Sequence, residues 1–236
     1  MSLIGRIEAP LSLTDQAVVA LRREIIACRL APGETVSETL MAERFPLGRA
    51  AIRTALSRLA EEGLVQAMPR RGWVVRVVTL RDIHEVCDLR MLLEPESARL
   101  AALNCGREPG SAARLRELDA ICARGYTPGD AESALDFLTA NREFHTGVAV
   151  LAGNDRLTRE IGRLLDEGTR MLVHGLSTRD RTVEMAHEHH ALVEAIARNA
   201  ADEAAQIMRE QVAASREMVL AALTGPRSPL IVSEPR

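Results

Sequence analysis

The spacing of apolar residues changes abruptly after Gly63, and this change limits the possible folds more than any other feature of the sequence. Before it, apolar residues recur at intervals of three and four, as on one face of a helix. After it they alternate, as along a strand. The alternation is interrupted by the turn sequence Pro-Arg-Arg-Gly at 69–72. The alternating positions are Val65, Ala67, Trp73, Val75 and Val77.

Three helices are predicted before this hairpin. The first covers residues 13–27, Ser37 can cap a short second one, and the third runs from 49 to 62. Turn signals at Pro32-Gly33 and Pro46-Leu47-Gly48 separate them. Three helices followed by a hairpin with a basic tip describe a winged helix-turn-helix domain, which we place at residues 11–78.

From residue 79 the pattern is helical almost to the end of the chain. We therefore expect a mainly α protein whose second domain, at 79–224, is an all-α antiparallel helical bundle. Residues 225–236 contain three prolines and are expected to form a tail. The predicted helices of the second domain are 80–104, 111–124, 131–151, 155–175, 180–198 and 201–223.

Composition favours a helical protein that works in the cytoplasm. Aromatic residues make up only 2% of a chain that is 47% hydrophobic, so the core must be aliphatic. No apolar run is long enough to cross a membrane, and the N-terminus lacks the pattern of a signal peptide. The cysteines have no CxxC spacing and are expected to be buried in a reducing compartment. They are Cys28, Cys87, Cys105 and Cys122.

Charge is distributed unevenly between the two predicted domains. The whole chain carries a formal charge of −3. Residues 11–78 contain ten arginines and seven acids, whereas residues 79–236 contain 19 arginines and 25 acids. A mildly basic first domain beside an acidic second domain is the charge distribution expected of a protein whose first domain contacts the phosphates of a nucleic acid.

Two groups of residues are candidates for contacting DNA. Arg49 and Arg53 are four residues apart, so both lie on one face of the third helix, where guanidinium groups can reach bases and phosphates. Thr54 and Ser57 fall on the same side. At the hairpin tip, two arginines and a glycine can approach the backbone closely. Each motif alone could be an ordinary solvated surface. The tip residues are Arg70, Arg71 and Gly72.

Residues 25–75 resemble the DNA-binding domain of GntR-type regulators. The resemblance lies in the order and spacing of 18 positions. The sequence departs from the family pattern at Cys28, Gly48, Ala51 and Thr54, among others, and Gly48 lacks a hydroxyl that could cap the third helix. The matching positions are Ile25, Leu30, Pro32, Gly33, Glu38, Ala42, Arg49, Arg53, Ala55, Leu56, Leu59, Glu62, Gly63, Leu64, Val65, Arg70, Gly72 and Val75.

The second half resembles the FCD domain of the FadR-like branch of the same family. The segments that carry this resemblance are 88–94, 141–145, 153–154 and 188–196. It implies a homodimer that binds a pseudo-palindromic DNA operator, often as a repressor. It also implies a small-molecule effector, in most relatives an organic acid, bound among the helices.

The resemblance also implies a divalent metal such as zinc, nickel or manganese. Its four ligand positions correspond to Asn141, His145, His189 and Gln211, and only the histidines are usual ligands. We therefore expect weak metal binding or none. Without a metal, the four side chains can bind the effector directly, and Arg90 or Arg170 can pair with its carboxylate.

Three alternatives stay open from the sequence. Arg90 and Glu94 are four residues apart, so they can simply brace one helix. The protein can bind DNA without any effector. An enzyme is the least favoured reading, because the chain has no phosphate-binding glycine loop and no nucleophile elbow.

Overall fold

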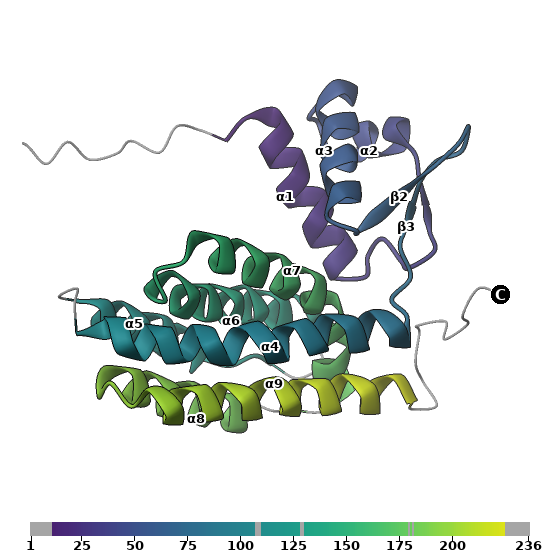
Figure 1. Cartoon of the computed structure of the whole chain (residues 1–236). Coiled ribbons are helices and arrows are strands. Elements are labelled where there is room, and N and C mark those ends of the chain that lie inside the picture. Colours follow the sequence, from purple (N-terminus) through teal and green to yellow (C-terminus); the bar gives the residue numbers. More distant parts are fainter. Residues whose placement is uncertain (1–10, 107–109, 128–129, 179, 181, 225–236) are drawn as a thin grey trace, which may run out of the picture. The chain divides into compact units, whose positions relative to one another are not determined.

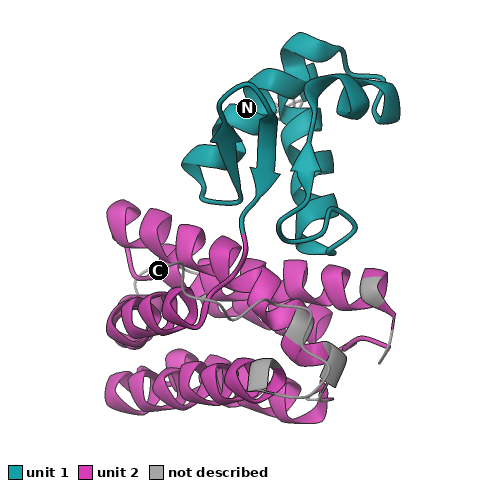
Figure 2. Cartoon of the chain, turned by 90° about the vertical axis from the view of Figure 1, so that its right-hand side faces the viewer, with its two compact units in different colours: residues 1–76 teal, residues 77–236 magenta. Residues whose placement is uncertain are grey.

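In the computed structural model the chain divides into two compact units, residues 1–76 and 77–236 (Figure 2). The structure describes residues 11–106, 110–127, 130–178, 180 and 182–224. The expected tail at 225–236 lies outside the described residues. Each unit is considered by itself.

The first unit has the predicted winged helix-turn-helix order. Its three strands form one antiparallel sheet in the order β1-β3-β2, with Val65 opposite Val75 and Ala67 opposite Trp73. Strand β1 was not predicted, because two residues are too few to show an alternation. The elements are α1 (Leu13–Ile26), β1 (Thr35–Val36), α2 (Glu38–Arg44), α3 (Arg49–Glu61), β2 (Val65–Met68) and β3 (Gly72–Val75).

A side-chain cap explains where α2 begins, whereas α3 begins without one. The hydroxyl of Ser37 accepts a hydrogen bond from the backbone N–H of Leu40 at 3.1 Å, so Ser37 caps α2 as predicted. Helix α3 begins after Gly48, which provides no side-chain cap. The first backbone N–H groups of α3 therefore have no capping side chain as a hydrogen-bond partner.

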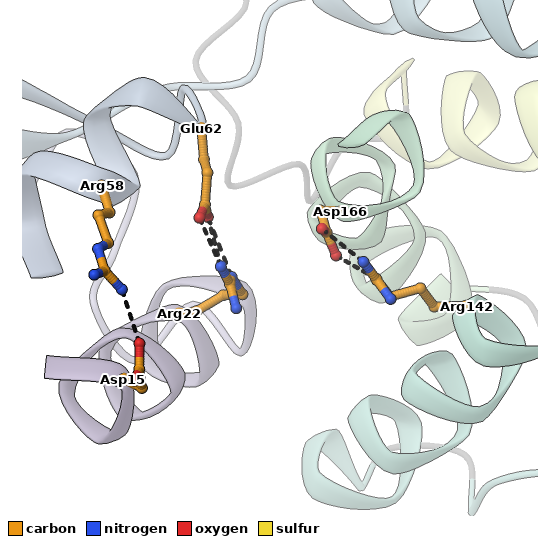
Figure 3. Close-up of polar contacts among 6 residues, drawn as sticks. All are labelled: Asp15, Arg22, Arg58, Glu62, Arg142 and Asp166. Carbon is orange, nitrogen blue, oxygen red and sulfur yellow. Dashed lines mark hydrogen bonds and ion pairs between the residues drawn. The ribbon is translucent and has the colours of Figure 1, made fainter. Parts of the chain in front are cut away.

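Aliphatic packing and two ion pairs hold α1 against α3. Leu21, Ile52 and Leu56 are completely buried at the centre of the unit. At the edge, Arg58 binds Asp15 at 2.8 Å and Arg22 binds Glu62 at 2.7 Å, as Figure 3 shows. Because these pairs are half-exposed, the buried aliphatic side chains contribute most of the stability.

The second unit is a helical bundle, as predicted, and α4 packs along the length of α9 (Figure 1). Helix α4 starts with a capping box in which Thr79 and Asp82 exchange hydrogen bonds. Arg142 of α6 binds Asp166 of α7 at 2.5 Å (Figure 3). The helices are α4 (Leu80–Cys105), α5 (Ser111–Cys122), α6 (Ala131–Leu151), α7 (Asp155–Thr178), α8 (Thr182–Ala197) and α9 (Ala201–Thr224).

Three of the four cysteines are buried as predicted, but Cys28 is exposed. It follows α1 in a turn with a φ of 54°, outside any helix or strand, so no apolar face covers it. Burial raises the pKa of the Cys122 thiol to about 12, which makes that thiol unreactive. No helix within the described ranges is both long and apolar enough to cross a membrane.

Gly72→Ala is expected to destabilise the first unit more than Gly48→Ala. Both glycines have positive φ, 89° and 77°, so alanine costs about 1–2 kcal/mol of backbone strain at either position. At Gly72 the new Cβ would also lie 2.8 Å from the carbonyl oxygen of Val36, whereas nothing lies within 4 Å at Gly48. Urea unfolding, followed through the fluorescence of Trp73, the only tryptophan, measures both. Equal losses would contradict the steric argument.

Candidate functional site

The first candidate surface is the exposed side of α3. Arg49 and Arg53 are both exposed on its N-terminal half, and the Arg53 side chain is 69% exposed. Thr54 and Ser57 are also exposed, but their hydroxyls donate to the carbonyls of Ala50 and Arg53, at 3.0 and 3.1 Å. Hydrogen-bond donors on this surface therefore come mainly from the two guanidinium groups.

The second part of this surface is the tip of the β2–β3 hairpin. Arg70 and Arg71 are exposed there, and Arg70 has a φ of 63°. The backbone N–H of Arg71 donates to the carbonyl of Met68 at 3.0 Å and closes the turn. The hairpin therefore presents two positive charges from a short, hydrogen-bonded turn, which suits contact with a sugar-phosphate backbone.

The structure adds a residue to this surface that the sequence did not single out. Glu38, the first residue of α2, accepts hydrogen bonds from the Nε atom of Arg53 at 2.9 and 3.0 Å. These bonds lower the pKa of Glu38, and a hydrogen bond from Trp73 lowers it further. Arg53 is therefore held in one direction by a carboxylate. Glu38 matched the family pattern, but its distance of 15 residues from Arg53 gave no sign of contact.

A second candidate site, the buried polar cluster, lies inside the helical unit. Its members come from four helices, and no member is more than 5% exposed. Such a set of polar side chains in a core is costly unless the groups are paired or bind a ligand. The members are Arg90 and Glu94 of α4, Asn141 and His145 of α6, His189 of α8 and Gln211 of α9.

Arg90 and Glu94 form an ion pair of 2.5 Å at the centre of this cluster. Oε2 of Glu94 also lies 3.1 Å from Nδ1 of His145, although the ring N–H is not well aligned for a hydrogen bond. Burial would raise the pKa of Glu94, but Arg90 and then His145 outweigh burial and hold the pKa at about 2. Since Glu94 stays ionised, Arg90 remains paired with it. A ligand carboxylate would have to compete with Glu94 for the guanidinium group of Arg90.

The two histidines of the cluster face each other across α6 and α8. Their ring centroids are 5.4 Å apart, and Phe144 stacks on His189 at 4.2 Å. Burial, and secondarily His145, lowers the pKa of His189 well below its usual value, so this ring is neutral. Gln211 donates from Nε2 to the carbonyl of Glu188 at 2.8 Å, which brings α9 beside the histidine pair.

The predicted site residues are thus only partly brought together. His145 and His189 are in contact, Gln211 bonds the residue before His189, and Asn141 lies one turn from His145 on the same helix. Arg170 is half-buried on α7, next to Thr169. Five buried polar atoms of the cluster have no hydrogen-bond partner among the residues that the structure describes. They are Oε2 of Glu94, Oδ1 of Asn141, Nδ1 of His145, Nδ1 of His189 and Oε1 of Gln211.

This set of side chains does not fit a tight transition-metal site. Two imidazoles and two neutral amide oxygens supply no negative charge to offset that of the cation, and the carboxylate of Glu94 already faces Arg90. Among the residues that the structure describes, no three or more His, Cys, Asp or Glu side chains are placed to hold an ion. His190 cannot replace a ligand, because its exposed ring lies 3.4 Å from Asp119, away from the cluster.

Both units match known families. Residues 13–75 match the model of bacterial regulatory proteins of the gntR family, and residues 85–214 match the FCD domain. The chain is 38% identical over 90 residues to the HTH-type transcriptional repressor RspR of Escherichia coli, an alignment that covers 38% of this chain and 40% of RspR. It is 26% identical to the E. coli repressor GlaR over 215 residues, 87% of this chain and 94% of GlaR.

Solved structures share the same fold. E. coli McbR/YncC superposes with a TM-score of 0.71 at 23% identity, over 88% of this chain and 98% of that one. A GntR regulator from Rhodococcus sp. RHA1 gives a TM-score of 0.70 at 22% identity, over 89% and 99%. The chain belongs to the gntR family of bacterial regulatory proteins and is a transcription regulator with a C-terminal FCD domain, not an enzyme.

Proposed function

We propose that the protein is a ligand-responsive repressor that acts in the cytoplasm and binds a pseudo-palindromic operator as a homodimer. The observation that carries the proposal is the exposed arginine surface of the first unit, with Arg49 and Arg53 on α3 and Arg70 and Arg71 on the hairpin. In a dimer, the two α3 helices would enter successive major grooves about 34 Å apart. RspR and GlaR are both named as repressors, which supports repression rather than activation.

We further propose that the buried polar cluster binds the effector, a small organic acid. The support is chemical: besides the five unpartnered cluster atoms, the hydroxyls of Ser97 and Thr146 are buried without a hydrogen-bond partner among the described residues. Each buried unpartnered group costs about 1–3 kcal/mol, which a ligand with complementary groups would recover. The hydroxyls and the imidazoles of His145 and His189 can donate to a carboxylate, while Arg90 stays paired with Glu94.

Selection of bound fragments from a genomic DNA library tests this function. The recovered fragments should share two inverted half-sites, and organic acids that raise the melting temperature of the protein should weaken its binding to those fragments. A protein that binds inverted half-sites but responds to no metabolite across a broad set would instead be a DNA-binding protein without an effector. Failure to enrich any sequence would contradict the proposal.

The first prediction concerns the arginines. Arg53→Ala should cost about 1–3 kcal/mol on the selected operator if Arg53 contacts a base. Arg71→Ala should weaken specific and random DNA alike and lower the slope of log K against log salt by about one. Arg114→Ala, which removes an exposed arginine of the second unit, is the control and should change neither. A folded Arg49→Ala, Arg53→Ala double variant with normal operator affinity would refute the assignment.

A second prediction concerns Glu38. Glu38→Gln should raise affinity for random duplex DNA and steepen its salt dependence, because Arg53 is no longer neutralised. It should also reduce discrimination between operator and random DNA, because Arg53 is no longer aimed. Glu43→Gln removes the same charge from an exposed position of the same helix. If both variants change the discrimination between operator and random DNA equally, the effect comes from the lost negative charge and not from the orientation of Arg53.

A third prediction concerns metal. Protein purified without a histidine tag should hold zinc, nickel or manganese well below one ion per chain by elemental analysis. Asn141→Asp combined with Gln211→His supplies a carboxylate and a third imidazole, so this variant should approach one ion per chain. Adding His145→Ala should abolish the gain. Stoichiometric metal in the unmodified protein, lost on His145→Ala, would show that the four side chains do form a metal site.

A further inference from the structure

The unpartnered atoms of the buried polar cluster are biased towards hydrogen-bond acceptors. Oδ1 of Asn141, Oε1 of Gln211 and Oε2 of Glu94 are buried, and none has a hydrogen-bond partner among the described residues. Amide oxygens and ionised carboxylate oxygens can accept hydrogen bonds but cannot donate them. These three oxygens therefore need donors, and a bound ligand is one source of them.

Existing bonds fix two of these acceptors in place. Nε2 of Gln211 donates to the carbonyl of Glu188 at 2.8 Å, so the oxygen of the same amide points away from that carbonyl. Oε1 of Glu94 accepts from Nε of Arg90 at 2.5 Å, which leaves Oε2 on the side of His145. Turning either group towards another donor would break the bond that holds it.

The three acceptors come from three helices that adjoin the histidine pair. Oε2 of Glu94 on α4 lies 3.1 Å from Nδ1 of His145. Asn141 is one turn before His145 on α6. Gln211 of α9 bonds the residue before His189. None of the three acceptor residues is more than 4% exposed. Acceptors on three helices suit a group whose donors also point in three directions.

The charges of the cluster favour a ligand without net charge. Arg90 and Glu94 neutralise each other, and the ring of His189 is neutral. A plain carboxylate would bring one uncompensated negative charge into the core, and a simple amine would bring one positive charge, both at a high cost. A zwitterion carries one charge of each sign, so it can enter without leaving a net charge in the helical unit.

We propose that the effector is a zwitterionic amino acid whose ammonium group is held by the oxygens of Glu94, Asn141 and Gln211. The proposal rests on the effector site of the proposed function and names the chemical class of its ligand. An ammonium group carries three donors and no acceptor, so it can pair with all three oxygens at once. The ligand carboxylate then meets groups that can donate, the imidazoles and the hydroxyls of Ser97 and Thr146.

This assignment agrees with the poor fit of the cluster to a metal ion. Neutral amide oxygens and a carboxylate that already faces Arg90 are weak ligands for a transition metal. The same oxygens are good acceptors for the N–H groups of a cation, because hydrogen bonds from a charged donor are the stronger ones. A positive group of the ligand would thus lie where the family resemblance expects a metal.

Matched ligands test the ammonium group. Amino acids are compared with the 2-hydroxy acids and the unsubstituted acids of the same carbon skeleton, such as alanine with lactate and propionate, or aspartate with malate and succinate. Titration calorimetry in the presence of a chelator should show the best amino acid binding about tenfold to a hundredfold more tightly than its unsubstituted acid, because that acid leaves the buried acceptors unpaired. A hydroxy acid or unsubstituted acid that binds as tightly as the amino acid would overturn the proposal.

Asn141→Asp gives a test by sign. Aspartate has nearly the shape of asparagine and adds a negative charge, so the amino acid should bind about tenfold more tightly and its unsubstituted acid more weakly. Asn154→Asp is the matched control, because Asn154 is exposed and its Oδ1 caps α7, a role that aspartate keeps. It should change neither affinity. Asn141→Leu removes the acceptor without adding charge and should weaken only the amino acid. Melting temperatures without ligand verify folding.

The outcomes separate this proposal from the proposed function. If organic acids without an amino group bind and weaken operator binding, while no amino acid does, the ammonium site is overturned and the ligand-responsive regulator stands. If no metabolite of either class binds, the effector fails together with this proposal. A folded Asn141→Asp variant that changes the affinities for amino acids and unsubstituted acids in the same direction would also overturn the ammonium site.

Discussion

The buried Arg90–Glu94 pair is the interaction around which the helical unit is organised. A lone carboxylate in a core would take up a proton, but Arg90 holds Glu94 ionised at a pKa of about 2. The ionised carboxylate then faces His145, whose ring meets His189, which stacks on Phe144. One charge on α4 is therefore close to a row of rings that come from α6 and α8. Removing either partner would leave a buried charge, at a cost of about 3–5 kcal/mol.

Much of the fold could be predicted because apolar spacing records which face of each helix is buried. Apolar residues spaced three and four apart predicted a helix at 131–151, and α6 has these bounds. The same spacing places Phe144 and Val148 on the buried face of that helix. Contacts between distant elements leave no such record. Neither the two-residue strand β1 nor the exposure of Cys28 depends on a repeating pattern. The bond between Glu38 and Arg53 depends on how α2 and α3 cross, which sequence spacing does not give.

The site residues show the same division. Asn141 and His145 could be placed on one face, because positions four apart on a helix coincide. Whether they bind a metal or an effector could not be predicted, because that depends on which other side chains are buried beside them. Arg90 was a candidate partner for a ligand carboxylate, and it faces Glu94 at 2.5 Å. The sequence also offered that pairing as a helix brace, and only the burial of both groups shows how strongly they are coupled.

The position of Trp73 in the sheet has a practical consequence. Trp73 is the only tryptophan of the chain and pairs with Val36, two residues before Glu38, whose carboxylate binds Arg53. Indole emission is sensitive to nearby charge, so the intrinsic fluorescence of the protein should respond to any change in the ion pair between Glu38 and Arg53. A single natural fluorophore beside this pair would then serve as an optical probe of it, with no label attached.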